Sequence, residues 1–483
     1  MTHPLVEGVA TDLWIDGQWC PASDGGRFDV DDPATEQVIA SVASATVEDC
    51  ILAVDAASKA LKAWAGLTPR ARGEILRRAY ELMVQEGEKL AQIVTLENGK
   101  SLADARGEIA YAAEFFRWNA EEAVRISGQL SHAPSSGARI LVNHKPIGVA
   151  LLVTPWNFPA AMATRKIAPA LAAGCTVVIK PASATPLTLQ ALIPILTAAG
   201  VPAGVVNLVP SRASGKVVSA MLMDDRVRVI SFTGSTEVGR VLLRQAAEKI
   251  VRPAMELGGN APFIVFEDAD IEAAVDGAMI AKMRNMGEAC TAANRFYVHA
   301  AVSDAFSRAM ASRMAALKMG NGLEDGVAVG PLVNADTRDK VRDLVNDAVA
   351  RGAKILTGGE CPNGPGFFYP PTVLTHVDPE SDLVREEIFG PVAAIQTFTS
   401  EDEMVALANA SEYGLASYIY TQDLTRGLRV AERLEAGMVG LNRGLVSDPA
   451  APFGGVKQSG LGREGGHEGV LEFLETQYVS VSW

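Results

Sequence analysis

From about residue 147 onward, short runs of β-branched residues alternate with longer stretches rich in alanine and leucine, and this alternation constrains the fold more than any other feature. The first such runs are residues 149–153, 177–179, 205–209 and 229–232. Buried strands separated by helical stretches are typical of parallel sheets, whose strands need crossover connections. A second alternation begins at residues 263–266 and continues through 296–298. We therefore predict two α/β domains built on parallel sheets, with their boundary near Glu256.

Size and charge exclude several classes of protein. At 483 residues the chain is too long for one hydrophobic core, so two or three domains are expected. Its 57 acidic and 43 basic residues give a net charge of -14, which would repel a nucleic acid. The longest apolar run, residues 167–179, is shorter than the roughly 20 residues that span a bilayer, and the first residues do not resemble an export signal. We expect a cytoplasmic protein with neither a nucleic-acid nor a membrane partner.

The cysteines and histidines are scattered along the chain. The five cysteines stand at positions 20, 50, 175, 290 and 361, with no CxxC pair, and the six histidines show no metal-ligand spacing. We therefore expect no metal site and no disulfide framework, as in a reducing compartment.

Both ends of the chain carry signals of local structure. Asp16-Gly17, between residues 13–15 and 18–19, predicts a tight β-hairpin. Thr68-Pro69 predicts the start of a helix that ends at Asn98-Gly99. The final residues, 478–483, alternate like a strand that has no obvious partner in either domain.

Three short runs contain residue types suited to chemistry at a carbonyl carbon. Cys290 ends Gly-Glu-Ala-Cys at 287–290, Glu256 opens Glu-Leu-Gly-Gly-Asn at 256–260, and Asn157 is central in Pro-Trp-Asn-Phe-Pro at 155–159. A thiol is a strong nucleophile, and a glutamate can take a proton from a thiol or a water. Singly, each residue has a simpler interpretation, as a buried small side chain, a turn former or the end of an element. In their order and spacing, the three runs resemble the NAD(P)-dependent aldehyde dehydrogenase superfamily over almost the whole chain.

The resemblance implies an α/β, aldehyde dehydrogenase-like fold with two Rossmann-like parallel-sheet domains plus a small β oligomerisation module. The cofactor-binding domain would comprise residues 1–125 and 143–253, and the catalytic domain residues 254–440. The bridging module would comprise 126–142 and 465–483, whose terminal strand adds to a neighbouring subunit in this family. A homodimer or homotetramer is therefore expected.

The resemblance also implies a reaction, the oxidation of an aldehyde to a carboxylic acid. Cys290 would add to the aldehyde carbon and form a thioester once hydride has left. The side chain of Asn157 and the backbone N–H of Cys290 would hold the oxyanion, and Glu256 would activate the water that hydrolyses the thioester.

Cofactor signals follow the first sheet. The run Phe-Thr-Gly-Ser-Thr-Glu-Val-Gly at 232–239 places Gly234 and Ser235 between a strand and a helix, where backbone N–H groups can hold a pyrophosphate. NAD-preferring relatives usually have a glutamate at the position of Ser183, beside the adenosine ribose. Serine there, near Lys180, favours NADP, with NAD possible. The other cofactor positions that the resemblance implies are Trp156, Asn157, Ala182, Leu257, Glu387 and Phe389.

Within the superfamily the chain is most similar to the succinate-semialdehyde dehydrogenases. That group holds the distal carboxylate of its substrate with two arginines and a serine, and the matching positions are Arg165, Arg284 and Ser447. Two departures bear on the substrate: Glu288-Ala289 replaces the usual Gln-Thr before the nucleophile, and Arg443 stands where smaller or acidic residues are common. A longer semialdehyde, such as glutarate semialdehyde, is therefore an alternative substrate.

Three other functions are less compatible with these sequence features. A thioester could pass to coenzyme A, but acylating relatives do not use the water-activating glutamate, so Glu256 argues against them. A cysteine hydrolase would need a histidine partner for the thiol, and the pattern around Cys290 offers none. A non-catalytic protein on this fold would not need Asn157, Glu256 and Cys290 together.

Overall fold

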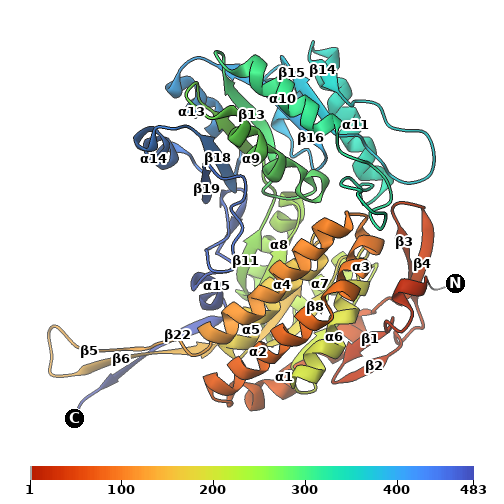
Figure 1. Ribbon diagram of the computed structural model, residues 1–483. Helices are drawn as coiled ribbons and strands as arrows, with labels where there is room; N and C mark the ends of the chain where they lie inside the picture. Colours follow the sequence, from red (N-terminus) through yellow and green to blue (C-terminus); the bar gives the residue numbers. More distant parts are fainter. Residues whose placement is uncertain (1–2) are drawn as a thin grey trace.

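The computed structural model describes residues 3–483, which form two lobes, each built around a β-sheet (Figure 1). Counted over these residues, the first sheet has eight strands in the order β2-β1-β9-β8-β7-β10-β11-β21. Its strands are β1 (Leu13–Ile15), β2 (Gln18–Cys20), β7 (Val149–Val153), β8 (Thr176–Lys180), β9 (Val206–Leu208), β10 (Val227–Thr233), β11 (Arg252–Glu256) and β21 (Gly460–Leu461). The strands from β9 to β11 are parallel neighbours, as the alternation predicts.

The second sheet follows in the other lobe. Over the described residues it has seven strands in the order β14-β15-β16-β13-β12-β18-β19, all parallel except β14. These are β12 (Ala261–Val265), β13 (Ala293–His299), β14 (Lys354–Thr357), β15 (Thr372–Thr375), β16 (Val392–Phe398), β18 (Ala416–Tyr420) and β19 (Met438–Leu441). The two α/β sheets confirm the predicted fold class, whereas the domain boundaries stay a prediction.

Helices cover the sheets of both lobes (Figure 1). In the first lobe they are α1 (Val47–Ala65), α2 (Pro69–Gln85), α3 (Gly87–Asn98), α4 (Leu102–Glu122), α5 (Pro159–Ala173), α6 (Leu187–Ala199), α7 (Ser214–Leu222) and α8 (Thr236–Lys249). In the second they are α9 (Ile271–Met283), the 3₁₀ turn η2 (Arg284–Gly287), α10 (Ser303–Ala315), α11 (Ala335–Ala350), α12 (Asp382–Arg385), α13 (Glu401–Asn409) and α14 (Leu424–Arg433). Smaller elements are η1 (Pro4–Val6), the hairpin β3 (Arg27–Asp32) and β4 (Gln37–Ala43), the pair β17 (Tyr413–Gly414) and β20 (Val456–Lys457), and α15 (Glu468–Leu471).

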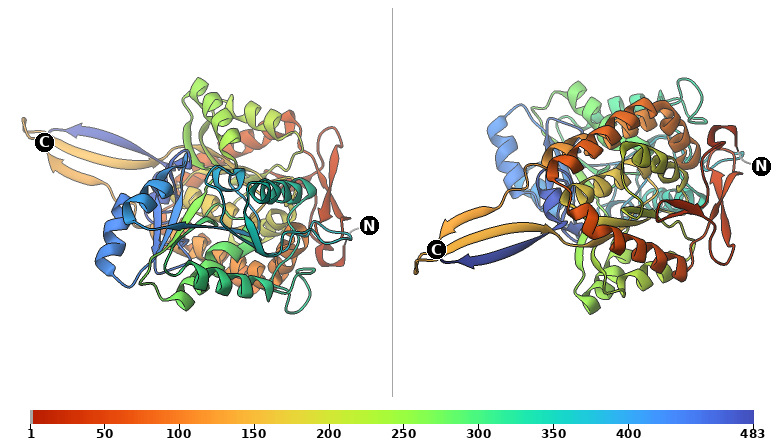
Figure 2. Two further views of the ribbon diagram at one scale, coloured as in Figure 1. Left: turned by 90° about the horizontal axis from the view of Figure 1, so that it is seen from above. Right: turned by 90° about the horizontal axis from the view of Figure 1, so that it is seen from below.

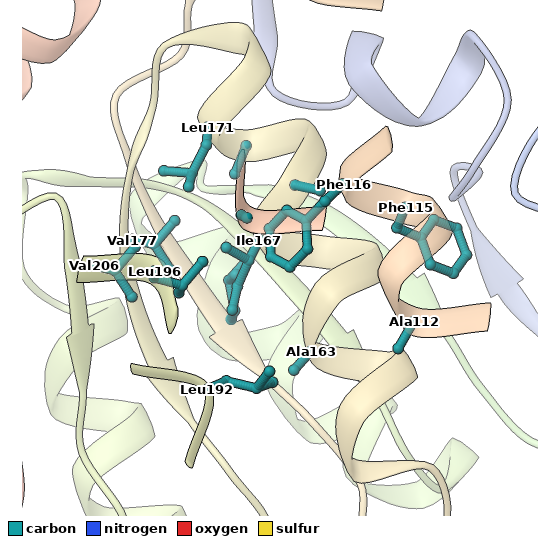
Figure 3. Packing of buried hydrophobic residues seen from close by; sticks show 14 of the residues in the cluster. Ala112, Phe115, Phe116, Ala163, Ile167, Leu171, Val177, Leu192, Leu196 and Val206 are labelled. Carbon is teal, nitrogen blue, oxygen red and sulfur yellow. The ribbon is translucent and has the colours of Figure 1, made fainter. Parts of the chain in front are cut away.

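The core of the first lobe is centred on α5, which is buried along its whole length. Ala112 and Phe116 of α4 face Ala163 and Ile167 of α5 (Figure 3). The small side chains of α5 let α4 approach closely on one side and the sheet on the other. The chain segment that leads into α5 is therefore held by close packing.

The predicted hairpin and the start of α2 are confirmed, but the expected helix over 69–98 is two helices. Thr68 caps α2 by accepting the N–H of Ala71, and α3 ends at the left-handed Gly99. Between them Glu86 leaves helical geometry, with φ -88° and ψ 8°, just before a glycine. Glycine is a poor helix former, and the break lets α3 take its own direction against α4.

A three-stranded arm projects from the first lobe in all views (Figures 1 and 2). It consists of β5 (Gln129–His132), β6 (Arg139–Pro146) and β22 (Leu474–Val481), in the order β22-β6-β5. The C-terminal strand therefore does have a partner in its own chain, because β22 pairs with β6 from Leu474 opposite Pro146 to Val481 opposite Arg139. Short-range sequence signals did not identify this pairing, since over 300 residues separate the two strands.

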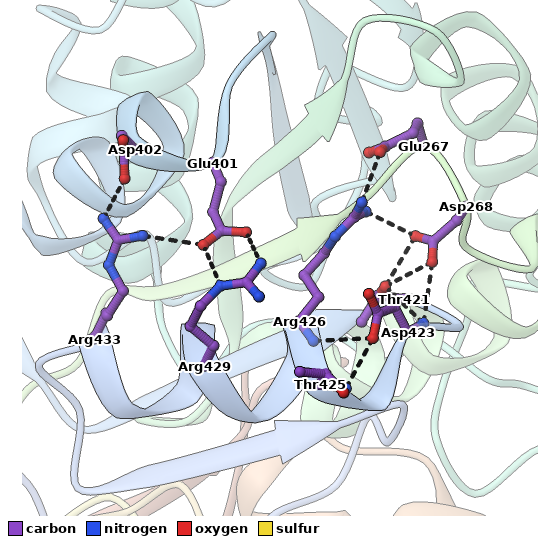
Figure 4. Close-up of polar contacts among 10 residues, drawn as sticks. All are labelled: Glu267, Asp268, Glu401, Asp402, Thr421, Asp423, Thr425, Arg426, Arg429 and Arg433. Atoms are coloured by element: carbon purple, nitrogen blue, oxygen red, sulfur yellow. Dashed lines mark hydrogen bonds and ion pairs between the residues drawn. The ribbon is translucent and has the colours of Figure 1, made fainter.

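Ion pairs hold α14 against neighbouring segments of the second lobe (Figure 4). Arg429 and Arg433 both bind Glu401 at the start of α13, and Arg426 binds Glu267 and Asp268 after β12. These side chains are partly exposed, so each pair adds little stability, but together they orient the helix.

Within residues 3–483, no helix is both long and apolar enough to cross a membrane.

Residues 257–260 connect β11 of the first sheet to β12 of the second, and their backbone touches the predicted nucleophile. A Cβ atom added to Gly259 would lie 2.1 Å from the carbonyl oxygen of Cys290 and 3.3 Å from its carbonyl carbon. Both groups are backbone, so neither can turn away as a side chain could. The connector and the turn that carries Cys290 are packed together here.

Gly259→Ala should therefore lower the free energy of unfolding by about 1–3 kcal/mol, because the methyl group forces two backbone segments apart. Urea denaturation measures the change. Gly107→Ala in α4 is the matched control, since its Cβ would meet nothing within 4 Å and should raise helix stability by about 0.5–1 kcal/mol. Equal stability of the two variants would contradict the packing described.

Candidate active site

A cavity of about 250 Å³ lies where the two lobes meet the connector. Among the residues predicted from sequence to form the site, those that line it are Trp156, Asn157, Arg165, Gly234, Ser235, Leu257, Arg284, Cys290, Glu387, Phe389 and Ser447. β7, β10 and β11 are adjacent and parallel, so the segments that follow them meet at one edge of the sheet. Residues that are far apart in the chain are thereby brought together.

Cys290 follows an unusual turn. After α9, Asn285 and Met286 have left-handed backbone, with φ 50° and 55°, and Gly287 follows with φ 77°. This backbone conformation is strained for residues other than glycine, so contacts with neighbouring residues must stabilise it. Asp104 accepts the N–H of Asn285 at 3.1 Å, and the Asn285 side chain donates to the carbonyl oxygens of Asn157 and Glu288 at 2.9 and 3.0 Å.

The Cys290 thiol is poorly solvated. Burial raises its pKa to about 12, an effect that Arg165 reduces and that Glu387 and Glu256 increase. A thiol with such a pKa is almost wholly protonated near neutral pH, so it must lose its proton to a base before it can attack a carbonyl.

Hydrogen bonds hold both the side chain and the backbone of Asn157. Its side-chain Nδ2 donates to the carbonyl oxygen of Glu288 at 3.0 Å, and its own carbonyl oxygen accepts the buried Lys100 Nζ at 2.7 Å. Lys100 in turn pairs with Glu108, which also accepts the N–H groups of Ala160 and Ala161 at the start of α5. The amide is thus held beside Cys290, with one N–H group of Nδ2 left for an oxyanion.

Glu256 ends β11 and is buried, although it does not line the cavity. Its Oε2 has no hydrogen-bond partner within the described part of the chain. Burial, followed by the charge of Glu464, raises the pKa of Glu256 well above its ordinary value. The group therefore holds its proton to a higher pH than an ordinary glutamate and becomes a base as the pH rises.

Arg165 belongs to a buried charge cluster that also contains Lys166 and Glu464. Arg165 Nε lies 2.5 Å from Glu464 Oε2, its guanidinium carbon lies 4.1 Å from the centre of the Phe453 ring, and Lys166 binds the same carboxylate. Burial opposes the charge on Glu464, but Lys166 and Arg165 outweigh it and lower the pKa of that carboxyl. Arg165 therefore lines the cavity, but its guanidinium is already paired with the carboxylate of Glu464.

Arg284 differs from Arg165 in this respect. Its guanidinium carbon lies 4.9 Å from the centre of the Phe158 ring and 5.5 Å from that of Tyr111, and within residues 3–483 it forms no ion pair. An arginine packed on aromatic rings in a cavity, with its charge unmatched, can bind an anionic ligand. Arg443, by contrast, is exposed, bonds the carbonyl oxygen of Leu445 and does not line the cavity.

The other end of the cavity suits a dinucleotide. Ser235 caps α8 by accepting the N–H of Val238, so the free N–H groups of the first turn face the cavity edge. Glu387 accepts the N–H of Gly259 at 2.9 Å, and burial raises its pKa to about 7. Phe389 packs edge-on against Trp156, with ring centres 5.4 Å apart.

Lys180 is the last residue of β8, Ala182 and Ser183 follow it, and all three lie outside this cavity. Burial lowers the pKa of Lys180 to about 8, whereas Ala182 and Ser183 are partly exposed. Because β8 is the neighbour of β7 in the sheet, this segment leaves the same edge and can contact the far end of an extended ligand.

Several residues of the site were missed by sequence reasoning. Lys100, Tyr111 and Glu464 carry no local signal, although the Arg165-Lys166 pair in an otherwise mostly apolar stretch implies an acid nearby. The role of Glu288 is also resolved in part: its Oε1 accepts the N–H of Val333 at 3.1 Å, and burial raises its pKa well above the ordinary value. Glu288 thus ties the nucleophile turn to the segment before α11 through this hydrogen bond.

Comparison with known proteins agrees with this geometry. The model of the aldehyde dehydrogenase family matches residues 19–479. The chain is 55% identical to a succinate-semialdehyde dehydrogenase of Paenarthrobacter nicotinovorans, over 92% of this chain and 99% of that protein. It is 49% identical to a glutarate-semialdehyde dehydrogenase of Pseudomonas putida, over 97% of each. The crystal structure of an NADP-dependent enzyme from E. coli matches with a TM-score of 0.97, at 45% identity and over 98% of each chain. With a cavity that holds its cysteine, asparagine and arginine together, and a family match over nearly its full length, this protein belongs to the aldehyde dehydrogenase family.

Proposed function

We propose that the protein oxidises succinate semialdehyde to succinate through a thioester on Cys290. The observation that carries the proposal is that Cys290 shares its cavity with Arg284, whose charge has no carboxylate partner within residues 3–483. A four-carbon aldehyde acid presents a carbonyl and a carboxylate at opposite ends, which suits a nucleophile and an arginine in one cavity. The similarity to succinate-semialdehyde dehydrogenases supports the same substrate.

In the first half of the reaction, Cys290 loses its proton and its sulfur attacks the aldehyde carbon. The Nδ2 of Asn157 and the backbone N–H of Cys290 stabilise the oxyanion that forms, and each such donor contributes about 3 kcal/mol in comparable enzymes. A nicotinamide cofactor, when bound, accepts hydride from the carbon. Leu257, Glu387 and Phe389 would position it, and the thioester stays on Cys290.

In the second half, Glu256 takes a proton from water, which attacks the thioester and releases the acid. Because the pKa of Glu256 is raised, a smaller fraction of this carboxyl is ionised at a given pH than of an ordinary glutamate. Hydrolysis by this base should therefore accelerate as the pH rises, until Glu256 is fully ionised. Coenzyme A as the acceptor is disfavoured, because Glu256 would then have no role.

For the cofactor, we propose NADP as the preferred form, with NAD accepted. Ser183 offers a neutral hydroxyl where a glutamate would repel a 2′-phosphate, and Lys180 lies at the end of the adjoining strand. Lys180, Ala182 and Ser183 would hold the adenosine end, and Trp156, Gly234 and Ser235 the region nearer the pyrophosphate.

For assembly and location, we propose a cytoplasmic homodimer or homotetramer. The strands β5 and β22 are the outer strands of the projecting arm, and an open strand edge can pair with another chain. The five cysteines are free thiols, as is usual in a reducing compartment. We retain the domain division of 1–125 with 143–253, 254–440, and 126–142 with 465–483.

Glu256→Gln should separate the two halves of the reaction. Amide nitrogen cannot act as a base, so we expect a burst of reduced cofactor stoichiometric with the active sites, followed by slow turnover. Stopped-flow absorbance measures both phases. Cys290→Ala is the control and should show neither phase, and an unchanged steady-state rate for Glu256→Gln would remove Glu256 from its assigned role.

Ser183→Glu should shift the preference from NADP towards NAD, because the carboxylate repels a 2′-phosphate and can bind both hydroxyls of an unmodified ribose. The ratio of kcat/KM for the two cofactors is the readout. Ser183→Ala, the matched control, should change this ratio much less. A wild-type protein that already prefers NAD strongly would contradict the assignment of Ser183.

Arg284→Met should lower kcat/KM for succinate semialdehyde by tenfold or more, since a charge-assisted hydrogen bond contributes about 1.5–3 kcal/mol. Methionine keeps the aliphatic packing on Phe158, so oxidation of butanal should change little. Arg443→Met removes an exposed arginine outside the cavity and should leave both substrates unaffected. Equal losses for the charged and neutral aldehydes would refute the binding of a carboxylate at Arg284. Arg165 is less suited to this test, because its removal would strand Glu464.

A further inference from the structure

Tyr111 of α4 lines the same cavity, yet neither the sequence motifs nor the reaction scheme uses it. Its hydroxyl is buried and has no hydrogen-bond partner among residues 3–483. Buried polar groups are nearly always bonded, because an unpaired hydroxyl loses its water without compensation. An unpaired hydroxyl on a cavity wall is therefore available to a ligand.

The ring of Tyr111 is held in place by its neighbours. It packs edge-on against Phe115, with ring centres 4.9 Å apart, and the guanidinium carbon of Arg284 lies 5.5 Å from its centre. Arg165 is also close to the hydroxyl, without a well-aligned hydrogen bond to it. Burial raises the pKa of Tyr111, so the hydroxyl keeps its proton and can donate.

The other cationic group on this wall is already engaged. Arg165 pairs with Glu464, and Lys166 shares that carboxylate, so Arg165 is less available to a ligand than an arginine without an ion pair. Arg284 alone cannot saturate a carboxylate, which has about four lone-pair sites on two oxygens. The hydroxyl groups of Tyr111 and Ser447 are among the other donors that line the cavity.

We propose that Tyr111 is a specificity-determining residue that donates a hydrogen bond to the distal carboxylate of the substrate, beside Arg284. This inference rests on the proposed function, since it requires a substrate with an acid group at its far end. It gives Tyr111 two effects on selectivity. An aldehyde acid gains a bond to the hydroxyl, whereas a neutral aldehyde fills the cavity and leaves the hydroxyl unpaired.

Tyr111→Phe removes one oxygen atom and keeps the ring packing. We expect kcat/KM for succinate semialdehyde to fall about tenfold or more, mainly through KM, because the bond exists before and after the chemical step. For butanal, kcat/KM should stay the same or rise, because the unpaired hydroxyl is gone. Succinate should weaken to a similar degree as a competitive inhibitor, which reports binding without the chemical step.

Two controls accompany the variant. Tyr80→Phe changes a tyrosine of α2 that does not line the cavity, and it should alter neither substrate. The thermal midpoint of Tyr111→Phe should not decrease, because no internal hydrogen bond is lost. Parallel losses for both aldehydes, or a lowered midpoint, would indicate a packing role and overturn the proposal.

Arg284→Met separates this inference from the proposed function. If Arg284→Met loses selectivity for the acid while Tyr111→Phe matches the wild type, the function stands and the role of Tyr111 is refuted. If neither variant affects succinate semialdehyde, carboxylate binding on this wall fails, and both proposals fall together. A loss in both variants that spares butanal supports the assignment.

Discussion

The hydrogen bond from Asn157 Nδ2 to the carbonyl oxygen of Glu288 joins the two halves of the site. Asn157 follows a strand of the first sheet, whereas Glu288 precedes Cys290 in the second lobe. A second bond, from Asn285 Nδ2 to the carbonyl oxygen of Asn157, runs in the opposite direction and supports the left-handed turn at 285–287. The oxyanion donor and the nucleophile therefore hold each other in register, and Gly259 can pass beside Cys290 only because it has no side chain.

Burial sets the chemistry of the groups around this bond. It raises the pKa of Cys290, Glu256, Glu288 and Glu387, so each of these groups carries less negative charge at a given pH than it would in water. The raised pKa values reduce the repulsion of an anionic substrate, and a proton must move before either half of the reaction. The buried Glu464 is the exception, since Lys166 and Arg165 keep it ionised.

The sequence predicts features whose physical cause is local. The Asp16-Gly17 turn, the Thr68 cap and the parallel strands were all expected, because turn chemistry, capping and apolar runs act over a few residues. The cavity also brings together most of the residues that the family resemblance proposed, although their roles stay predictions. The break at Glu86, the pairing of β22 with β6 and the partnership of Arg165 with Glu464 were not foreseen. Each depends on packing between distant segments, which leaves no local pattern.

In the proposed reaction, the acid is released from a thioester that forms on Cys290. Rapid acid quench of the wild-type enzyme with NADP and succinate semialdehyde, followed by peptide mass spectrometry, tests it most directly. We expect a succinyl group on the peptide that contains Cys290, on the time scale of the first turnover and dependent on the oxidised cofactor. A succinyl group on Cys20, Cys50, Cys175 or Cys361 instead, or turnover without any acylated cysteine, would contradict it.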